Sequence, residues 1–273
     1  MNARTATARA EPGKPAHIGD HLREWRLRRH LSQLDLASDA DISARHLSFV
    51  ETGRAAPSRD MVLRLAERLQ VPLRERNVLL VAAGFAPAFP HRSLQDPELK
   101  NARAAIELVL RAHEPNPALA YDRHWNLVAA NRMVAPLLEG VPARLMAQPL
   151  NILRLAFHPE GLAARTVNLA EWCGHLLERL HRQCEITADP DLIRLYQELK
   201  TYPIPARLRP PAADNVAIPL KLRLNGEVLS FISTTMVFGT PVDITLSELA
   251  LETFFPADDG TAERMRALAS RLE

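Results

Sequence analysis

Arg45 and His46 stand next to each other in a short segment whose apolar residues repeat at helical spacing. Leu47 and Val50 are three residues apart and would form the buried stripe of a helix. The residues that this stripe leaves on or near the outer face are Ala44, Arg45, His46, Ser48 and Phe49. An arginine on such a face can form a bidentate pair with a guanine in the DNA major groove, so the chemistry to expect is base reading.

Two short helices separated by a tight turn would hold this face in place. Residues 33–38 would form the first helix, with Leu34 and Ala37 facing inward. A turn then leads to the second helix, and each helix has a serine at its N-cap, Ser32 and Ser43. This order is a helix-turn-helix, which places its second helix in the major groove.

Three further helices would complete the domain. Gly53 suits the left-handed residue that often ends a helix, and Pro57-Ser58 restarts the chain. The additional apolar stripes are Ile18, Leu22 and Trp25 before the motif, then Met61, Val62, Leu65, Ala66 and Leu69, then Val78, Leu79, Ala82 and Ala83. We therefore expect a complete, all-α domain of five short helices.

The helical pair also carries two sequence patterns, S-Q-x-x-L-A from Ser32 and L-x-x-x-E-x-G-R from Leu47. With them, residues 18–83 resemble the phage-repressor or Xre-like class of bacterial helix-turn-helix regulators, whose fold is lambda-repressor-like. The contacts that the resemblance implies are Gln33 and Ser43 with phosphate, Arg45 and His46 with base edges, and Arg54 with the DNA backbone from the loop.

The outer face departs from the family pattern. Members often carry glutamines at the base-reading positions, whereas this sequence has Ala44, Arg45 and Phe49. These residues suit a guanine read by Arg45 and a thymine methyl group near Ala44 or Phe49. Phe49 can equally pack against the fourth helix, and His46 can contact phosphate or water.

The charges are distributed unevenly along the chain. Residues 1–90 hold 14 Lys plus Arg against 10 Asp plus Glu, a net +4, and residues 91–273 hold 20 against 22, a net −2. This modest basic excess favours a few well-placed DNA contacts and a homodimer. The family often pairs an arginine of helix one with the glutamate ending helix three, and here Arg26 and Glu51 would form this structural ion pair. Further phosphate contacts, or solvated charges, would come from Arg23, Arg28 and Arg29.

Composition along the chain predicts the domain organisation. We expect a disordered tail over residues 1–16, the helix-turn-helix DNA-binding domain over 17–84, a linker over 85–95, a second domain over 96–258 and a C-terminal helix over 259–273. The first of these segments has no apolar period. No signal peptide or 18-residue apolar span is evident, so we expect a cytoplasmic protein without a membrane partner.

The second domain alternates helical and β-prone segments. Helices are predicted over residues 96–113, 150–157, 166–184, 189–200 and 261–272, and strands within 118–130 and over 216–224, 227–238 and 242–252. Asn225-Gly226 is a strong hairpin signal. Asn131 would cap a helix over 133–138, and this opening of strand, turn, strand and capped helix is typical of PAS-type domains. We therefore expect an α+β, PAS-like domain with an antiparallel sheet.

Two phrases carry a second resemblance, YDRHWNLVAANR from Tyr121 and VFGTPVDITLSELALETFFP from Val237. Together with the helix-turn-helix they resemble the MmyB-like regulators over most of residues 18–258. The resemblance implies a PAS-like module whose pocket, between sheet and helices, accepts an apolar small molecule; a bound fatty acid is associated with the type.

The sequence identifies the residues of this pocket less directly than it identifies the fold. Residues 229–238 alternate between two faces that both mix apolar and polar side chains, so either face could line the pocket. The candidates are Tyr121, Trp125, Leu127, Arg132, Phe231 and Met236, and the aromatic residues among them could equally be plain core. Arg132 or Arg223 could hold an acid headgroup.

Other chemistries find less support. Cys173 and Cys184 would stand about 16 Å apart on one helix, too far for a disulfide, so they are either small buried residues or a thiol sensor of oxidants or electrophiles. His175 and His181 match no usual zinc pattern. The sequence lacks Gly-x-Ser-x-Gly, a Gly-rich phosphate loop and His-Glu-x-x-His, so we expect no enzyme.

These observations favour a homodimeric transcription regulator that binds a double-stranded DNA operator. Its second domain would sense a small apolar effector, possible examples being a fatty acid or another apolar metabolite, and no other cofactor is expected. The alternatives are a thiol-based regulator and an adaptor that uses the five-helix domain to bind protein without reading DNA.

Overall fold

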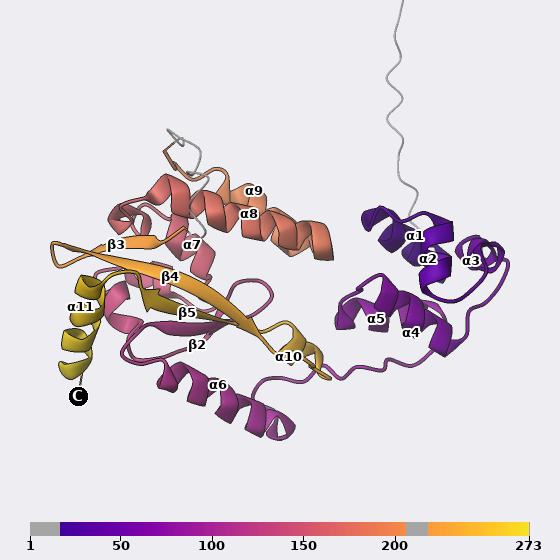
Figure 1. The fold of residues 1–273 in the computed structure, drawn as a ribbon, viewed down its shortest axis with the longest axis horizontal. Coiled ribbons are helices and arrows are strands. Elements are labelled where there is room, and N and C mark those ends of the chain that lie inside the picture. Colours follow the sequence, from indigo (N-terminus) through magenta and orange to yellow (C-terminus); the bar gives the residue numbers. More distant parts are fainter. Residues whose placement is uncertain (1–16, 206–217, 273) are drawn as a thin grey trace, which may run out of the picture. The chain divides into compact units, whose positions relative to one another are not determined.

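The computed structural model describes residues 17–205 and 218–272. The chain divides into two compact units between Pro90 and His91, each of which is a body of its own (Figure 1). The tail predicted for residues 1–16 and the strand start predicted at Val216 lie outside the described residues. Within the described ranges, no helix is long and apolar enough to cross a membrane.

The first unit folds, over residues 17–90, into five helices, as predicted. They are α1 (Ile18–Arg28), α2 (Gln33–Asp39), α3 (Ala44–Glu51), α4 (Arg59–Arg68) and α5 (Leu73–Ala82). Ser32 and Ser43 cap α2 and α3, and each hydroxyl accepts a hydrogen bond at 3.1 Å from the backbone N–H three residues on. Gly53, with φ 72°, supplies the left-handed residue after α3.

Two of the predicted apolar stripes, those of α2 and α5, differ from the residues that are buried in this unit. Leu34 is 69% exposed, and Leu36 is buried with Ala37 in its place. Because α2 has only seven residues, either leucine fits a one-turn stripe, and the packing of α2 against α3 and α4 decides between them. In α5, Val78 is likewise exposed and Leu80 is buried.

Helices α1 and α3 approach each other closely at Gly19. An ideal Cβ placed on Gly19 would lie 2.5 Å from the carbonyl oxygens of both Val50 and Glu51, closer than real Cβ atoms come to other atoms. Glycine is therefore required here by the contact between two backbones, although its own helical conformation would allow any residue.

A buried ion pair connects the same two helices, as the family resemblance implied. Arg26 Nε donates to Glu51 Oε1 at 2.7 Å and Nη2 donates to Oε2 at 2.9 Å. Arg26 Nη1 also donates to the carbonyl of Leu31, and Gln33 Nε2 donates to Glu51 Oε2 at 2.7 Å. These hydrogen bonds compensate the desolvation of both charges and hold α2 to the pair.

The second unit is built on a five-stranded antiparallel sheet with the order β2-β1-β5-β4-β3, formed within the described ranges. The strands are β1 (Ala118–Tyr121), β2 (Leu127–Ala130), β3 (Leu220–Leu224), β4 (Glu227–Val237) and β5 (Ala250–Pro256). Asn225 and Gly226, both with positive φ, form the predicted hairpin turn between β3 and β4. The α+β prediction is confirmed.

Helices cover both faces of this sheet (Figure 1). The α-helices are α6 (Lys100–Ala112), α7 (Ile152–Phe157), α8 (Leu169–Thr187), α9 (Pro190–Leu199), α10 (Ile244–Ser247) and α11 (Asp259–Ser270). The short 3-10 helices are η1 (Pro97–Leu99), η2 (Ala135–Leu138), η3 (Ala143–Met146) and η4 (Ala163–Arg165). The main hydrophobic core lies between the sheet and α7, α8 and α9, and a smaller cluster lies under α6.

The strand register assigns every sheet residue to one of these two faces. Leu119 faces the main core and Ala120 faces α6, and their partners on β5 are Glu252 and Leu251. Residues directly opposite each other share a face, so Glu252 points toward the main core. On β4, the register places Phe231 on that side and Met236, the partner of Leu251, on the α6 side.

Two predictions about the helices and strands of this unit are wrong. Asn131 is no helix cap: its buried amide accepts from the Ala118 N–H and donates to the carbonyls of Leu110 and Asn116, and so joins α6 to β1. The strand predicted over 242–252 begins only at Ala250, because the Asp243 carboxylate caps the short helix α10 that precedes it.

We predict that Glu51→Ala lowers the free energy of unfolding of the first unit by about 3–5 kcal/mol, because it leaves the Arg26 guanidinium buried without its counterion. Amide hydrogen exchange of the core residues Leu47 and Val50 measures this in the full chain. Glu24→Ala removes the carboxylate of the exposed Arg28–Glu24 pair on α1, the helix of Arg26, and should cost less than about 1 kcal/mol. Equal losses for the two variants would contradict a structural role for the Arg26–Glu51 pair.

Candidate functional sites: a DNA-facing helix and an apolar cavity

Helix α3 presents a mixed polar and aromatic face. Arg45 is exposed and its guanidinium lies over the Phe49 ring, 5.4 Å from the centroid, while His46 and Phe49 are half-buried. Ala44 is half-buried against the core of the unit, so it lies farther from the outer face than predicted. The side chains best placed to reach another molecule from α3 are therefore those of Arg45, His46 and Phe49.

Three flanking residues lie where the helices begin or end. Ser43 is exposed at the N-cap of α3, and Arg54 is exposed in the loop that folds back onto α3 through its N–H, which donates to the Phe49 carbonyl at 2.8 Å. Gln33 begins α2, and although one N–H of its amide is bound by Glu51, an amide nitrogen has a second donor. These groups surround α3 with hydrogen-bond donors.

The neighbouring arginines of α1 are engaged within the unit. Arg28 forms an ion pair with Glu24. Arg29 donates to the carbonyls of Leu69 and Gln70, and both guanidinium groups lie over the Trp25 ring. Their contribution to phosphate binding would therefore require these contacts to be exchanged.

The second unit contains a cavity of about 110 Å³ between the sheet and α7 and α8. Its lining is Pro117, Leu119, Trp125, Leu127, Val134, Leu137, Leu138, Leu150, Ile152, Leu153, Leu155, Ala156, Leu162, Trp172, Leu176, Arg179, Leu220, Leu222, Phe231, Glu252 and Phe254. Among these residues Arg179 and Glu252 alone are charged. A mainly apolar cavity can take an apolar molecule; an engineered apolar one of about 150 Å³ holds benzene.

The structure brings together three of the six residues proposed from the sequence. Trp125, Leu127 and Phe231 line the cavity. Met236 does not, because the register turns it to the α6 side of the sheet, where it is 40% exposed. Arg132 lies outside the lining as well, and its Nε donates to Glu114.

Tyr121 also lies outside the lining but takes part in a polar network beside it. Arg179 Nη1 and Nη2 donate to the two Glu252 oxygens at 3.0 Å each, and Nη2 also reaches the Tyr121 hydroxyl at 3.1 Å and Thr235 Oγ1 at 2.8 Å. The guanidinium lies over the Trp125 ring, which in turn stacks on Tyr121. The network thus forms one charged, internally neutralised end of an otherwise apolar cavity.

The ionisation of this network follows from its surroundings. Burial, reinforced by the Glu252 charge, raises the pKa of the Tyr121 hydroxyl far above its usual value, so the tyrosine stays protonated. Burial disfavours the charge on Arg179, but the hydrogen bonds and charge of Glu252 outweigh it and raise its pKa. Arg179 therefore keeps its positive charge beside Glu252.

Sequence reasoning missed Arg179 and Glu252, although each leaves a signal. Arg179 falls at a position of the apolar stripe of α8, seven residues after Trp172 and three after Leu176. Glu252 is the acidic residue inside the apolar strand ALETFFP. A buried charge implies a partner, but only the fold shows which charges meet.

The cavity wall near Trp125 is held by a tight turn. Trp125 has φ 66°, its N–H donates to the Asp122 carbonyl, and Asp122 Oδ1 accepts from the N–H groups of His124 and Asn126 at 2.9 Å. The indole N–H donates to Gln183 Oε1 on α8 at 2.8 Å. This turn therefore fixes the tryptophan between strand and helix.

The cysteines lie on α8 as predicted, and neither forms a disulfide. Burial raises the pKa of Cys173 to about 12 and also raises that of the half-buried Cys184. Because the thiolate is the reactive form, these shifts disfavour thiol sensing.

Comparison with known protein families gives two matches. Residues 102–268 match the MmyB-like transcription regulator ligand binding domain, and residues 22–76 match a helix-turn-helix family. Among curated proteins, none matches the sequence. The first match covers more than half of the chain and identifies a transcription regulator family, not an enzyme family. The chain belongs to the MmyB-like transcription regulators and combines an Xre-type helix-turn-helix DNA-binding domain with a ligand-binding domain.

Proposed function

We propose that this regulator reads its operator with the outer face of α3, as a homodimer, and that a small apolar ligand in the cavity of the second unit changes its affinity for DNA. The observation that carries the ligand part is the cavity itself, whose lining is apolar except for the Arg179–Glu252 pair. An acyl chain, such as that of a fatty acid, has the required chemistry.

The DNA part rests on the placement of cationic and hydrogen-bonding groups around α3. Arg45 is exposed on the helix and can reach a guanine, with Phe49 beneath its guanidinium. Ser43, Gln33 and Arg54 flank it, where phosphates would lie. Two such helices on successive turns of a pseudo-palindromic site stand about 34–36 Å apart, which is the reason to propose a dimer.

The cavity volume restricts the ligand. Pockets for drug-sized molecules usually span about 300–1,000 Å³, so a cavity of about 110 Å³ suits a short apolar group unless the surrounding side chains move. A long acyl chain would have to widen it. We therefore expect short or medium chains to bind with less rearrangement than long ones.

We predict different effects for the two exposed arginines. Arg45→Ala should reduce the preference for operator over random DNA by about 1–3 kcal/mol, because a base contact is lost, whereas Arg54→Ala should weaken binding to both DNAs alike and reduce the salt slope by about 1. Fluorescence anisotropy at several salt concentrations measures both. Arg223→Ala, an exposed cation of β3, is the control. Equal losses on operator and random DNA for both variants would contradict this division of roles.

We predict that Ala156→Leu blocks the ligand. Ala156 lines the cavity, and the added methyl groups occupy its space without introducing polarity. The purified protein is denatured and any released molecule is identified by mass spectrometry; medium-chain fatty acids are then titrated by calorimetry. The wild-type protein should bind the fatty acids and the Ala156→Leu variant should not. The control is Ala262→Leu, which lies outside this cavity on α11 and should bind them as the wild type does.

Ligand coupling provides the final test of this function. If occupancy regulates DNA binding, the ligand should change operator affinity by about 5–150-fold in the wild type, which corresponds to about 1–3 kcal/mol, and leave the affinity of Ala156→Leu unchanged. A ligand that binds stoichiometrically without changing operator affinity would refute the regulatory part of the proposal. If none of the apolar probes binds, the proposal that the ligand is apolar is refuted.

A further inference from the structure

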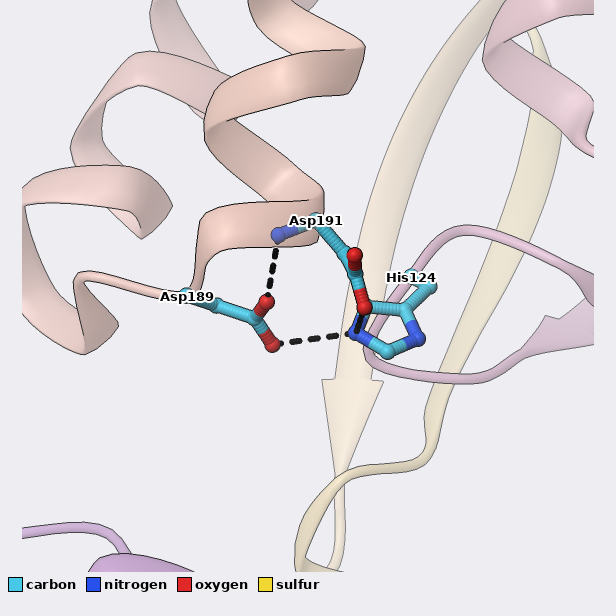
Figure 2. Close-up of side chains that lie close together, drawn as sticks. All are labelled: His124, Asp189 and Asp191. Atoms are coloured by element: carbon cyan, nitrogen blue, oxygen red, sulfur yellow. Dashed lines mark hydrogen bonds and ion pairs between the residues drawn. The ribbon is translucent and has the colours of Figure 1, made fainter.

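Three potential metal ligands converge at one edge of the second unit: His124, Asp189 and Asp191 (Figure 2). His124 belongs to the turn between β1 and β2, and both aspartates lie at the start of α9. His124 Nε2 lies 2.9 Å from Asp189 Oδ2 and 3.9 Å from Asp191 Oδ2, and the three ligand atoms lie within 4.8 Å of one another.

These separations suit one ion. Zinc bonds to histidine nitrogen and carboxylate oxygen measure about 2.0–2.2 Å, so neighbouring ligands of a tetrahedral site stand about 3.3–3.5 Å apart. The two distances from His124 lie on either side of this range. Rotation of the exposed Asp191 side chain, whose Oδ1 accepts from Arg194 Nη2, would bring the longer distance into this range.

The backbones that carry these groups are already held. The His124 N–H donates to Asp122 Oδ1, and its carbonyl accepts from Asn151 Nδ2 at 2.8 Å. Asp189 Oδ1 accepts the Asp191 N–H at 2.8 Å, which leaves Oδ2 turned to the imidazole. The side chain of Asp189 is 9% exposed and that of Asp191 is 53% exposed, so the site is open to solvent on one side, where a water ligand would lie.

An ion-pair cluster without metal is the competing interpretation. Arg123 Nη1 lies 3.3 Å from Asp189 Oδ2, but it also lies 3.7 Å from Glu248 Oε1. Arg123 can thus keep a carboxylate partner when a metal takes Asp189. The two interpretations predict opposite effects of removing Arg123. At a metal site the removal strengthens cation binding, whereas in an ion-pair cluster it removes a favourable contact.

We propose that His124, Asp189 and Asp191 bind a divalent transition metal of the zinc class, a second ligand site distinct from the apolar cavity. Imidazole selects such metals over Mg²⁺ and Ca²⁺, which take oxygen ligands. The metal would replace the hydrogen bond between His124 and Asp189, which already joins the β1–β2 turn to α9, with bonds to His124 and both aspartates. Because His124 precedes the cavity residue Trp125, this link would also fix one wall of the cavity.

The test uses the untagged full chain, stripped with a chelator and titrated with ZnCl₂ by calorimetry. We expect one saturable site, with MgCl₂ and CaCl₂ giving none at the same concentrations. His124→Ala and Asp191→Asn should each weaken zinc binding at least about tenfold, since loss of a ligand costs no less than loss of a supporting contact. Asp189→Asn keeps the helix cap and should behave likewise.

Two further variants separate the interpretations. His181→Ala alters a histidine that faces the single carboxylate of Glu185, and it should leave the zinc site unchanged. Arg123→Gln should strengthen zinc binding about fivefold, because a nearby positive charge is removed. No saturable zinc binding by the wild type, or binding that His124→Ala and Asp191→Asn leave unchanged while circular dichroism shows them folded, would overturn the proposal.

Discussion

A charged side chain can be buried in an apolar core only where an opposite charge meets it, and this constraint determines how α8 lies on the sheet. The pairing of β1 with β5 turns Glu252 toward the main core. Arg179 must then face it from α8, and Tyr121, Trp125 and Thr235 surround the pair with hydrogen bonds and an aromatic ring. The charged end of the cavity is therefore a direct result of strand register.

In the first unit, too, a buried charge is paired with an opposite charge, but the pair has a different structural role. Arg26 and Glu51 are also a buried bidentate pair, but they join one helix to another. Glu51 is the last residue of α3, so the pair anchors the end of the helix that carries Arg45. In one unit the buried pair therefore joins two helices, and in the other it borders the cavity.

Local chemistry made much of this architecture predictable, and long-range pairing made the rest unpredictable. Serine caps, Gly53 and the Asn225-Gly226 turn act within a few residues, so the five helices and the hairpin could be predicted from the sequence. The choice between Leu34 and Leu36 depends on partners outside α2. The register of β4 with β5 determines which face of β4 points into the cavity. This is why Phe231 lines the cavity and Met236 does not. Arg179 and Glu252 are 73 residues apart, so no local pattern could join them.

Gly19 gives the first unit a mechanical property. Because no side chain separates α1 from α3 at this point, the two backbones approach closely, which restricts sliding of one helix along the other. A change in the position of α1 at this point would therefore have to be accommodated by α3. If α3 reads bases as proposed, a helix supported in this way keeps its orientation when its outward side chains are exchanged, so a substitution on that face would change base preference without refolding the support.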